Sequence, residues 1–422
     1  MRRCFLLVAA LWAPTLLAQD TPTAFVGATV HPVRGTPIDD GAVVVHEGRI
    51  TYVGPRGGAP LDGARQLDVT GKVLMPGIVD THSHVGSGDG GDGSGPLHPD
   101  VRILDTLDPR ADTFVKARAG GITTVNVMPG SGHLMSGQTA YLKLRRANVI
   151  EDMLICDDPE TGICGGMKMA NGTNSLRGRS GFPGTRARSA ALQRELFYQA
   201  LAYRAKLANG DTTRDLRMEP LLEILDGRRI VHWHTHRHDD ILTALRIARE
   251  FGFTPVLHHV SEGWRVADEI AAAGAPASII LLDSPGGKLE ARGLYFQTGR
   301  ALEEAGVRTA YHTDDPIVDS RFFLREAALG VRAGLSRQAA LESLTLAGAE
   351  MLGMADRVGS LEVGKDADLI VLTGDPLSIY THVEQTWVDG EKVYDYTDPD
   401  DRPYATGGYE VYRSAASTAH ID

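Results

Sequence analysis

The sequence predicts an α/β protein whose central part is a parallel sheet covered by helices. Three observations lead to this prediction. The middle of the chain alternates short apolar strands with longer helical stretches, whereas both flanks carry short alternating stretches punctuated by glycines. The composition, with 42% hydrophobic and 23% charged residues, is typical of a globular protein.

Size and charge limit the classes of function. A chain of 422 residues suits one large domain with an accessory domain, or two to three small ones. The net charge of −11 at pH 7 would repel phosphate backbones, so nucleic acid is not an expected partner.

The first residues are typical of a secretory signal. Arg2 and Arg3 precede an apolar stretch over Phe5–Leu17, and Ala18 stands before polar residues. We therefore expect residues 1–18 to be a signal peptide that directs the protein to the periplasm or out of the cell. The stretch falls short of the ~20 residues that a bilayer-spanning helix needs, so a membrane anchor is the weaker alternative. No later segment is expected to cross a membrane.

The two flanks predict small antiparallel strands and hairpins. Short stretches near the N-terminus alternate apolar and polar residues between regularly placed glycines. Near the C-terminus, Asp389-Gly390 is a strong hairpin signal between two such stretches. The expected strands are Thr23–Val30, Ala42–Val45, Ile50–Val53, Gln66–Val69, Ala367–Leu372, Glu384–Val388 and Lys392–Tyr396.

The middle of the chain predicts repeated strand–helix units. The expected strands are Val73–Val79, Thr123–Val127, Gly166–Met169, Ile230–His234, Thr254–His259, Ala277–Leu282 and Thr309–His312. The expected helices are Ala111–Ala119, Ala190–Leu207, Asp239–Phe251, Gly263–Ala273, Leu289–Ala305 and Arg321–Ala333. About seven or eight such units over roughly 280 residues fit a closed (β/α)8 barrel, with an open doubly wound sheet as the alternative.

Two common enzyme motifs are missing from this middle part. No Gly-x-Gly-x-x-Gly directly follows an early strand and opens a helix, so the sequence does not support a dinucleotide site. No Gly-x-Ser-x-Gly occurs either, which weighs against a serine hydrolase.

Histidines stand at the carboxyl ends of the predicted strands, where barrel enzymes build their active sites. His82 and His84 are two residues apart, so in a strand both imidazoles face the same way. Two imidazoles that converge on one side form a candidate metal pair.

Four more histidines alternate at the end of a later strand, at His232, His234, His236 and His238. Histidine is seldom fully buried without partners, whereas its neutral ring is the commonest metal ligand. We expect one or two of the four to bind metal, and the others to support these ligands or to hold substrate.

The last strand ends add a further histidine and a carboxylate. His258 and His259 are adjacent, and we expect only one of them to point inward, although the spacing does not say which. Asp314 follows His312 at the end of the last strand, where a carboxylate could bind metal and take the proton of a metal-bound water.

Lys168 lies within an apolar strand, where an ammonium group is costly to bury. One interpretation is that its head reaches solvent or a carboxylate. The other is that carbon dioxide has converted it to a carbamate, which would supply an anionic bridge between two metals.

Two longer stretches identify a family. Val73–His84 is similar to the opening metal motif of the amidohydrolase superfamily, and Val358–Ile370 resembles its signature for re-entry into a small β domain. The sequence thus resembles metal-dependent hydrolases of this superfamily, in an imidazolonepropionase-like or dipeptidase-like branch. The resemblance covers nearly the whole mature chain.

This resemblance implies a (β/α)8 TIM barrel beside a small β-sandwich built from both chain ends. The domains that we expect are a signal peptide (1–18), the N-terminal part of the β-sandwich (19–74), the hydrolase barrel (75–355), the C-terminal part of the β-sandwich (356–398) and a polar tail (399–422).

The resemblance also implies a metal set. By the family's motif order, the ligands of the buried metal would be His82, His84 and Asp314, those of the second metal His234 and His259, and the bridge a carbamate on Lys168. Nitrogen and oxygen ligands suit zinc, so two zinc ions are expected, with manganese, iron or cobalt as alternatives. Related branches use one metal and have no bridging lysine. In relatives an acid often follows the Ala-x-Gly step, but Thr173 stands there, so that acid's role cannot be transferred.

The implied reaction is hydrolysis of an amide, peptide or cyclic amide C–N bond by a metal-activated hydroxide, with Asp314 as the catalytic proton acceptor. An exported dipeptidase or N-acyl amino acid hydrolase acting on a small molecule or short peptide is the first candidate. A one-metal cyclic deaminase or imidazolonepropionase-like enzyme is an alternative, and a catalytically inactive metal-binding protein on the same scaffold is the alternative of another class. The candidate substrate-binding residues are Tyr141, Arg177, His236, Arg237 and His312.

Cys156 and Cys164 remain after removal of the signal. In an exported protein they form either a disulfide or two free thiols. The sequence leaves the oligomeric state open, a homo-oligomer included.

Overall fold

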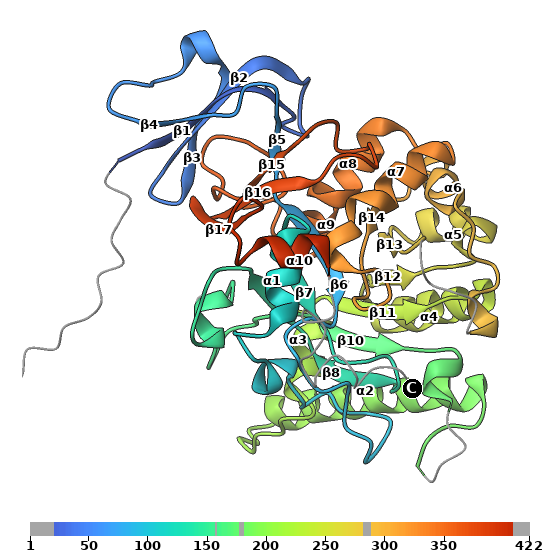
Figure 1. Ribbon diagram of the computed structural model, residues 1–422. Helices are drawn as coiled ribbons and strands as arrows, with labels where there is room; N and C mark the ends of the chain where they lie inside the picture. Colours follow the sequence, from blue (N-terminus) through green and yellow to red (C-terminus); the bar gives the residue numbers. More distant parts are fainter. Residues whose placement is uncertain (1–20, 157, 177–180, 282–287, 408–422) are drawn as a thin grey trace, which may run out of the picture.

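The computed structural model describes residues 21–156, 158–176, 181–281 and 288–407 (Figure 1). The expected signal peptide, Arg177 and most of the expected tail lie outside these residues. Within the described part of the chain, no helix is long and apolar enough to cross a membrane.

The first and the last strands of the described chain meet in one eight-stranded sheet, called the terminal sheet below, drawn in blue and red in Figure 1. Its strand order is β17-β16-β15-β5-β1-β2-β3, and β4 pairs with β1. The central strand β5 joins the two halves, because it runs parallel to β1 and antiparallel to β15. The strands are β1 (Thr23–Val30), β2 (Ile38–His46), β3 (Arg49–Pro55), β4 (Arg65–Asp68), β5 (Val73–Pro76), β15 (Leu369–Leu372), β16 (Val383–Val388) and β17 (Glu391–Asp395).

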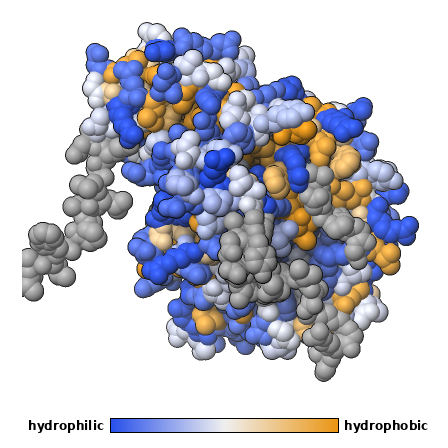
Figure 2. Space-filling model, in the orientation of Figure 1, coloured by the Kyte–Doolittle hydropathy of each residue, from blue (hydrophilic) through white to orange (hydrophobic). Residues whose placement is uncertain are grey.

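Strands β1 and β2 are apolar on both faces, because successive residues of each strand point to opposite sides of the sheet. Phe25 and Val43 belong to one hydrophobic cluster, whereas their neighbours Val26 and Val44 belong to another on the opposite face. Figure 2 shows hydrophobic residues in this part of the molecule, surrounded by hydrophilic ones. The β16–β17 hairpin turns at Asp389 and Gly390, where φ is 50° and 76°. These positive values fit the Asp-Gly turn that the sequence predicts.

The middle of the chain forms the strands that carry the site. Strands β10 to β14 pair in parallel, in order along the chain, and β6 pairs in parallel with β7. The strand pairings form two sheets and do not by themselves close into one ring of eight. The parallel strands are β6 (Ile78–Ser83), β7 (Ile122–Val127), β10 (Met167–Ala170), β11 (Val231–Thr235), β12 (Val256–His259), β13 (Ala277–Ile279) and β14 (Thr309–Tyr311).

Helices lie around the outside of these strands in Figure 1. They are α1 (Asp112–Ala119), α2 (Arg186–Ala208), α3 (Glu219–Leu225), α4 (His238–Phe251), α5 (Ala267–Ala272), α6 (Thr298–Glu304), α7 (Leu324–Arg332), α8 (Arg337–Leu344) and α9 (Leu346–Met351), and α10 (Arg402–Thr406) follows the terminal sheet. The sequence did not predict α3, α8, α9 or α10.

Two expected elements are each divided by the structure. The expected strand Val73–Val79 ends at Pro76 and resumes at Ile78, because the chain passes from the terminal sheet into β6 at Gly77. A Cβ at Gly77 would lie 2.1 Å from Thr123 Oγ1, so only glycine fits there. The expected helix Leu289–Ala305 is a short 3₁₀ turn followed by α6, with an irregular segment between them.

Two short strands were not expected. β8 (Met135–Gln138) runs antiparallel to β10, and β9 (Ala140–Lys143) runs antiparallel to β7. β8 contains Ser136 and Gly137, so it lacks the apolar run that predicts the parallel strands.

A fully buried lysine joins β9 to the terminal sheet. Lys143 Nζ lies 2.8 Å from Asp366 Oδ2 and 2.9 Å from Asp368 Oδ1, and it also contacts Asp389. Burial alone would lower the pKa of Lys143, but the carboxylates of Asp368, Asp389 and Asp366 outweigh it and raise the pKa. The ammonium group is therefore held charged between the strands that bear the site and the sheet built from the chain ends.

We expect Lys143→Met to lower the free energy of unfolding by about 3–5 kcal/mol, because it leaves buried carboxylates without their counter-charge. Urea denaturation measures the change. Lys392→Met is the matched control, since Lys392 pairs with Asp395 near the surface and should change stability by less than about 1 kcal/mol. Equal stability of the two variants would contradict this role of Lys143.

Candidate metal centre

β6 brings the first histidine pair into the interior. His82 is fully buried, and His84 follows just beyond the end of the strand. Asp80 fixes this end, because its Oδ1 accepts a hydrogen bond from the Thr313 amide at 3.1 Å and its Oδ2 accepts one from Thr313 Oγ1 at 2.5 Å. The same junction continues at Asp314, whose amide donates to the carbonyl oxygen of His82 at 2.9 Å. The end of β6 is thus tied to the segment that follows β14.

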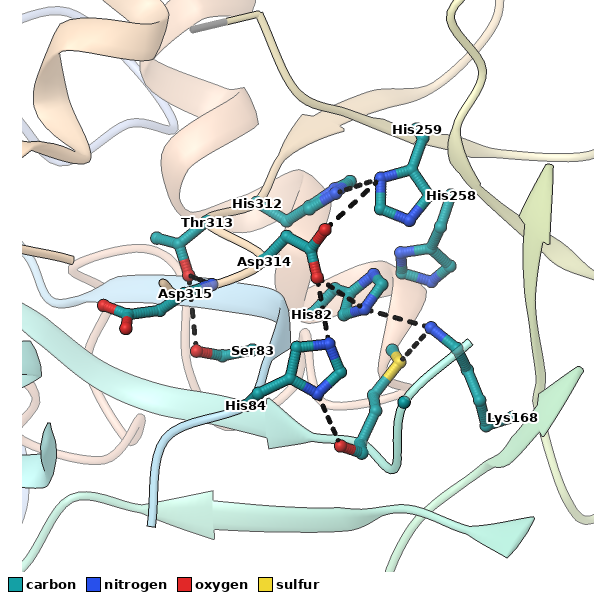
Figure 3. A network of polar contacts seen from close by, with 12 residues as sticks. His82, Ser83, His84, Lys168, His258, His259, His312, Thr313, Asp314 and Asp315 are labelled. Atoms are coloured by element: carbon teal, nitrogen blue, oxygen red, sulfur yellow. Dashed lines mark hydrogen bonds and ion pairs between the residues drawn. The ribbon is translucent and has the colours of Figure 1, made fainter. Parts of the chain in front are cut away.

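Asp314 faces the histidine pair. Its Oδ1 lies 2.9 Å from His84 Nε2 and 3.3 Å from His82 Nε2. Figure 3 shows Asp314 between these rings and His259. Burial alone would raise the pKa of Asp314, but the contact with His84 outweighs it and lowers the pKa to about 2. The carboxylate is therefore ionised at neutral pH.

The contacts of His84 indicate a place for a cation. Its Nδ1 lies 2.8 Å from the carbonyl oxygen of Met128, which can only accept a hydrogen bond, so Nδ1 carries a proton. In the neutral ring, Nε2 then presents a lone pair to the Asp314 carboxylate. Two facing acceptors need a positive charge between them, either a second ring proton or a shared metal ion. This arrangement fits a metal held by His84 and Asp314.

The alternating histidines of β11 divide into buried and exposed members. His232, His234 and His236 are all buried, whereas His238 starts α4 at the surface and bonds to Glu262 at 2.6 Å. Burial lowers the pKa of each buried ring, to about 3 for His232 and His236 and well below the usual value for His234. These rings are neutral, which is the form that binds metal.

The expectation that only one of His258 and His259 points inward is wrong. Both rings are buried, and each lies within about 5 Å of the His82 ring, with centroid separations of 5.0 and 4.9 Å. The backbone turns at the end of β12, where φ is 69° at His259 and 46° at Val260. This left-handed turn breaks the alternation of a regular strand and brings two successive side chains to the same side.

A relay of polar side chains orients His259. Its Nδ1 lies 3.2 Å from His312 Nε2, and His312 Nδ1 lies 2.7 Å from Ser278 Oγ. Ser278 Oγ in turn lies 2.6 Å from Thr81 Oγ1. The relay leaves Nε2 of His259 without a hydrogen-bond partner among the described residues, so this nitrogen can act as a ligand. Ser278 was not predicted, although a serine inside the short apolar strand β13 was a signal for it.

Lys168 is also fully buried, on β10. Its Nζ lies 3.0 Å from His82 Nε2 and 3.4 Å from Met128 Sδ. Burial lowers its pKa to about 7, so a large share of the amine is uncharged near neutral pH. The uncharged amine is the form that reacts with carbon dioxide, so this environment is compatible with a carbamate.

The candidate substrate-binding residues occupy different places. His236 and His312 lie among the clustered histidines, with Nδ1 of His236 2.8 Å from Ser261 Oγ. Tyr141 is instead buried behind the cluster, where its hydroxyl lies 2.8 Å from His232 Nε2. Arg237 pairs with Asp239 at 2.9 Å and does not join the cluster.

The two cysteines are joined by a disulfide. It closes the segment between Cys156 and Cys164, which precedes β10.

The ligand-type atoms of the site form three groups, and within each group the atoms lie within 4.8 Å of one another. The groups are His82–His259–Asp314, His234–His236–His259 and His82–His258–His312. Several of their nitrogens are buried and lack hydrogen-bond partners in the described part of the chain, including both nitrogens of His234. Neutral imidazoles and an ionised carboxylate with unused lone pairs fit divalent metal ions such as zinc.

Comparisons with known proteins give a consistent result. A family model described as the amidohydrolase family matches residues 206–394. A solved amidohydrolase from Thermotoga maritima is 34% identical, with a TM-score of 0.83, over 88% of this chain and 100% of that chain. The amidohydrolase tasK of Hapsidospora irregularis is 29% identical over 87% of this chain, which spans only 42% of that protein. A 5-methylthioadenosine/S-adenosylhomocysteine deaminase of Symbiobacterium thermophilum is 25% identical over 82% of this chain and 84% of its own length.

We expect Ser278→Ala to weaken metal binding about 10- to 100-fold, because it removes the hydrogen bond that orients His312 and, through it, His259. Titration of zinc against a competing chelator measures the effect. Ser343→Ala is the control, since Ser343 is equally buried but bonds only to a helix carbonyl. Unchanged zinc affinity in Ser278→Ala would show that the relay does not position a ligand.

Proposed function

Because this chain belongs to the amidohydrolase superfamily, we propose that it is a metal-dependent hydrolase of carbon–nitrogen bonds in amides, peptides or cyclic amides. The observation that carries the proposal is the convergence of buried neutral histidines on an ionised Asp314 at the carboxyl ends of parallel strands. Polar nitrogens buried in a protein are normally hydrogen-bonded. The buried ring nitrogens that lack a partner among the described residues therefore point to a bound ion.

We further propose that the two sheets of parallel strands are arcs of one closed (β/α)8 barrel. The hydrogen bond from the Asp314 amide to the carbonyl oxygen of His82 supports closure between β14 and β6. The barrel would span 75–355, and the terminal sheet would form the small β-sandwich from 19–74 and 356–398. Export, directed by residues 1–18, is part of the same proposal and rests on the sequence alone.

The residues divide into two sets of ligands in this proposal. His82, His84 and Asp314 would hold one metal, His234 and His259 would hold a second, and Lys168 would bridge them as a carbamate. Bound divalent metals lower the pKa of water toward neutrality and polarise a carbonyl group. The low pKa of Lys168 supports the carbamate, because it leaves the amine free to react.

Asp314 is the proposed acceptor of the proton of the attacking water. Its carboxylate is ionised at neutral pH and lies at the meeting point of both sets of rings, with Oδ2 4.0 Å from His259 Nδ1. We propose that it accepts the proton of the attacking water and passes it to the leaving nitrogen. His84, whose Nε2 faces Oδ1 of Asp314, holds that oxygen in place.

Two substrate classes are candidates. A dipeptide or N-acyl amino acid is the first, with His236 and His312, which lie among the clustered histidines, as the proposed contacts to its carbonyl or carboxylate. An aminated ring compound is the second, and the similarity to a 5-methylthioadenosine/S-adenosylhomocysteine deaminase favours it. Both classes use a metal-activated water and differ in the group that leaves.

We expect Asp314→Asn to lower kcat about 100- to 10,000-fold, because the amide cannot accept the proton that the carboxylate takes. Steady-state kinetics and metal analysis of the same sample separate loss of the proton acceptor from loss of the metal. Asp226→Asn is the control, since that carboxylate pairs with Arg204 at the surface. Near-normal turnover in Asp314→Asn would contradict the assigned role.

The substrate class is tested by incubating zinc-loaded protein with dipeptides, N-acyl amino acids and aminated ring compounds. We expect the protein to hydrolyse the dipeptides and the N-acyl amino acids, which is measured as the release of a free amino acid. Ammonia release from the ring compounds alone would favour the deaminase, and no turnover on any of them would favour a binding protein on the same scaffold.

A further inference from the structure

Three imidazoles converge where β11 and β12 end. The ring centroids of His234 and His236 lie 4.6 Å apart, those of His234 and His259 4.4 Å, and those of His236 and His259 4.9 Å. All three side chains are buried, with exposed fractions of 1%, 4% and 2% in that order. The three rings thus form one closed group, although the family's motif order uses only His234 and His259.

Hydrogen bonds occupy Nδ1 of two of the three rings and leave their Nε2 atoms for a ligand. His236 Nδ1 lies 2.8 Å from Ser261 Oγ, and His259 Nδ1 lies 3.2 Å from His312 Nε2. Nε2 of His236 and of His259 therefore remain, and neither has a hydrogen-bond partner among the described residues. His234 contributes two more such nitrogens.

A purely structural role does not account for this arrangement. Three buried imidazoles with unused ring nitrogens forfeit the hydrogen bonds that they would make with water. The neighbouring His238, which continues the same alternation, turns to the surface and bonds to Glu262. His238, the fourth histidine of the alternation, thus lies outside the group, whereas His236, the third one, lies within it.

We propose that His236 is the third protein ligand of the second metal, which makes that site a set of three histidines with an open position for water or substrate. Metal sites that do chemistry commonly have three protein ligands and one exchangeable position. With three imidazoles, the second metal does not depend on a carbamate at Lys168. This inference rests on the proposed metal centre, to which it adds a ligand.

The geometry of the group leaves little to be rearranged. Imidazole nitrogens on one tetrahedral zinc lie about 3.4 Å apart, given Zn–N bonds of roughly 2.0–2.1 Å. The ligand-type atoms of the three residues already lie within 4.8 Å of one another. The metal would draw them together by small side-chain rotations, and the hydrogen bond to Ser261 would keep His236 in the required tautomer.

The test compares metal binding by the full chain and by His236→Asn. Each protein is stripped of metal, loaded with zinc and dialysed, and its zinc content and affinity against a competing chelator are measured. We expect two ions in the wild type, and in His236→Asn one tight ion together with a second-site affinity at least about 100-fold weaker. Cobalt loading gives a spectroscopic readout, because loss of an imidazole changes the visible absorption of the second ion.

Three further variants extend the test. His238→Asn is the matched control and should bind both ions like the wild type, whereas Lys168→Met, which removes the proposed bridge, should still keep an ion at the three histidines. Ser261→Ala keeps every imidazole and should weaken the second site about 10- to 100-fold, so it tests the proposal even where His236→Asn does not fold.

The outcomes are distinguishable. A wild-type protein that binds no metal would overturn the proposed function together with this inference. A wild type with two ions, and unchanged second-site affinity and cobalt absorption in His236→Asn or Ser261→Ala, would overturn only the assignment of His236. Loss of the second ion in Lys168→Met, with retention in His236→Asn, would show that the lysine and not His236 completes the site.

Discussion

The exclusion of water from the carboxyl ends of the parallel strands is the constraint on which the site depends. Burial lowers the pKa of His82, His234, His258 and His259 well below the usual value, so their rings stay neutral and keep a lone pair. The same burial would protonate Asp314, but its contact with His84 keeps it ionised. An interior that holds neutral nitrogens around one carboxylate has one natural occupant, a cation that uses the remaining lone pairs.

Side chains behind the ligands hold this arrangement in place. On one side, Tyr141 contacts His232, whose Nδ1 lies 3.0 Å from His258 Nε2. On the other, Ser278 orients His312, which contacts His259. Such contacts fix which ring nitrogen carries the proton, and so which one is free to bind. Tyr141 and His312, which were expected as substrate contacts, thus also hydrogen-bond to neighbouring histidines, and their contact with substrate stays a prediction.

The terminal sheet contributes to the site indirectly. The stretch Val358–Ile370, recognised in the sequence as a family signature, supplies Asp366 and Asp368, which surround Lys143. Lys143 ends β9, and β9 pairs with β7 next to β6, the strand that carries His82. A signature that appears far from the metal residues in the chain thus acts by holding their strands against the sheet built from both ends.

The sequence alone determined where most strands lie, because β1 and the parallel strands carry strong alternation or apolar runs, and it placed the histidines and Asp314 at strand ends. It also predicted the Asp389-Gly390 hairpin, whose turn needs residues that accept positive φ. Only the tertiary structure decided which rings meet. The left-handed turn at His259 brings His258 inward beside it. The hydrogen bond between His236 Nδ1 and Ser261 joins two residues from different strand ends, and residue spacing carries no information about such a contact.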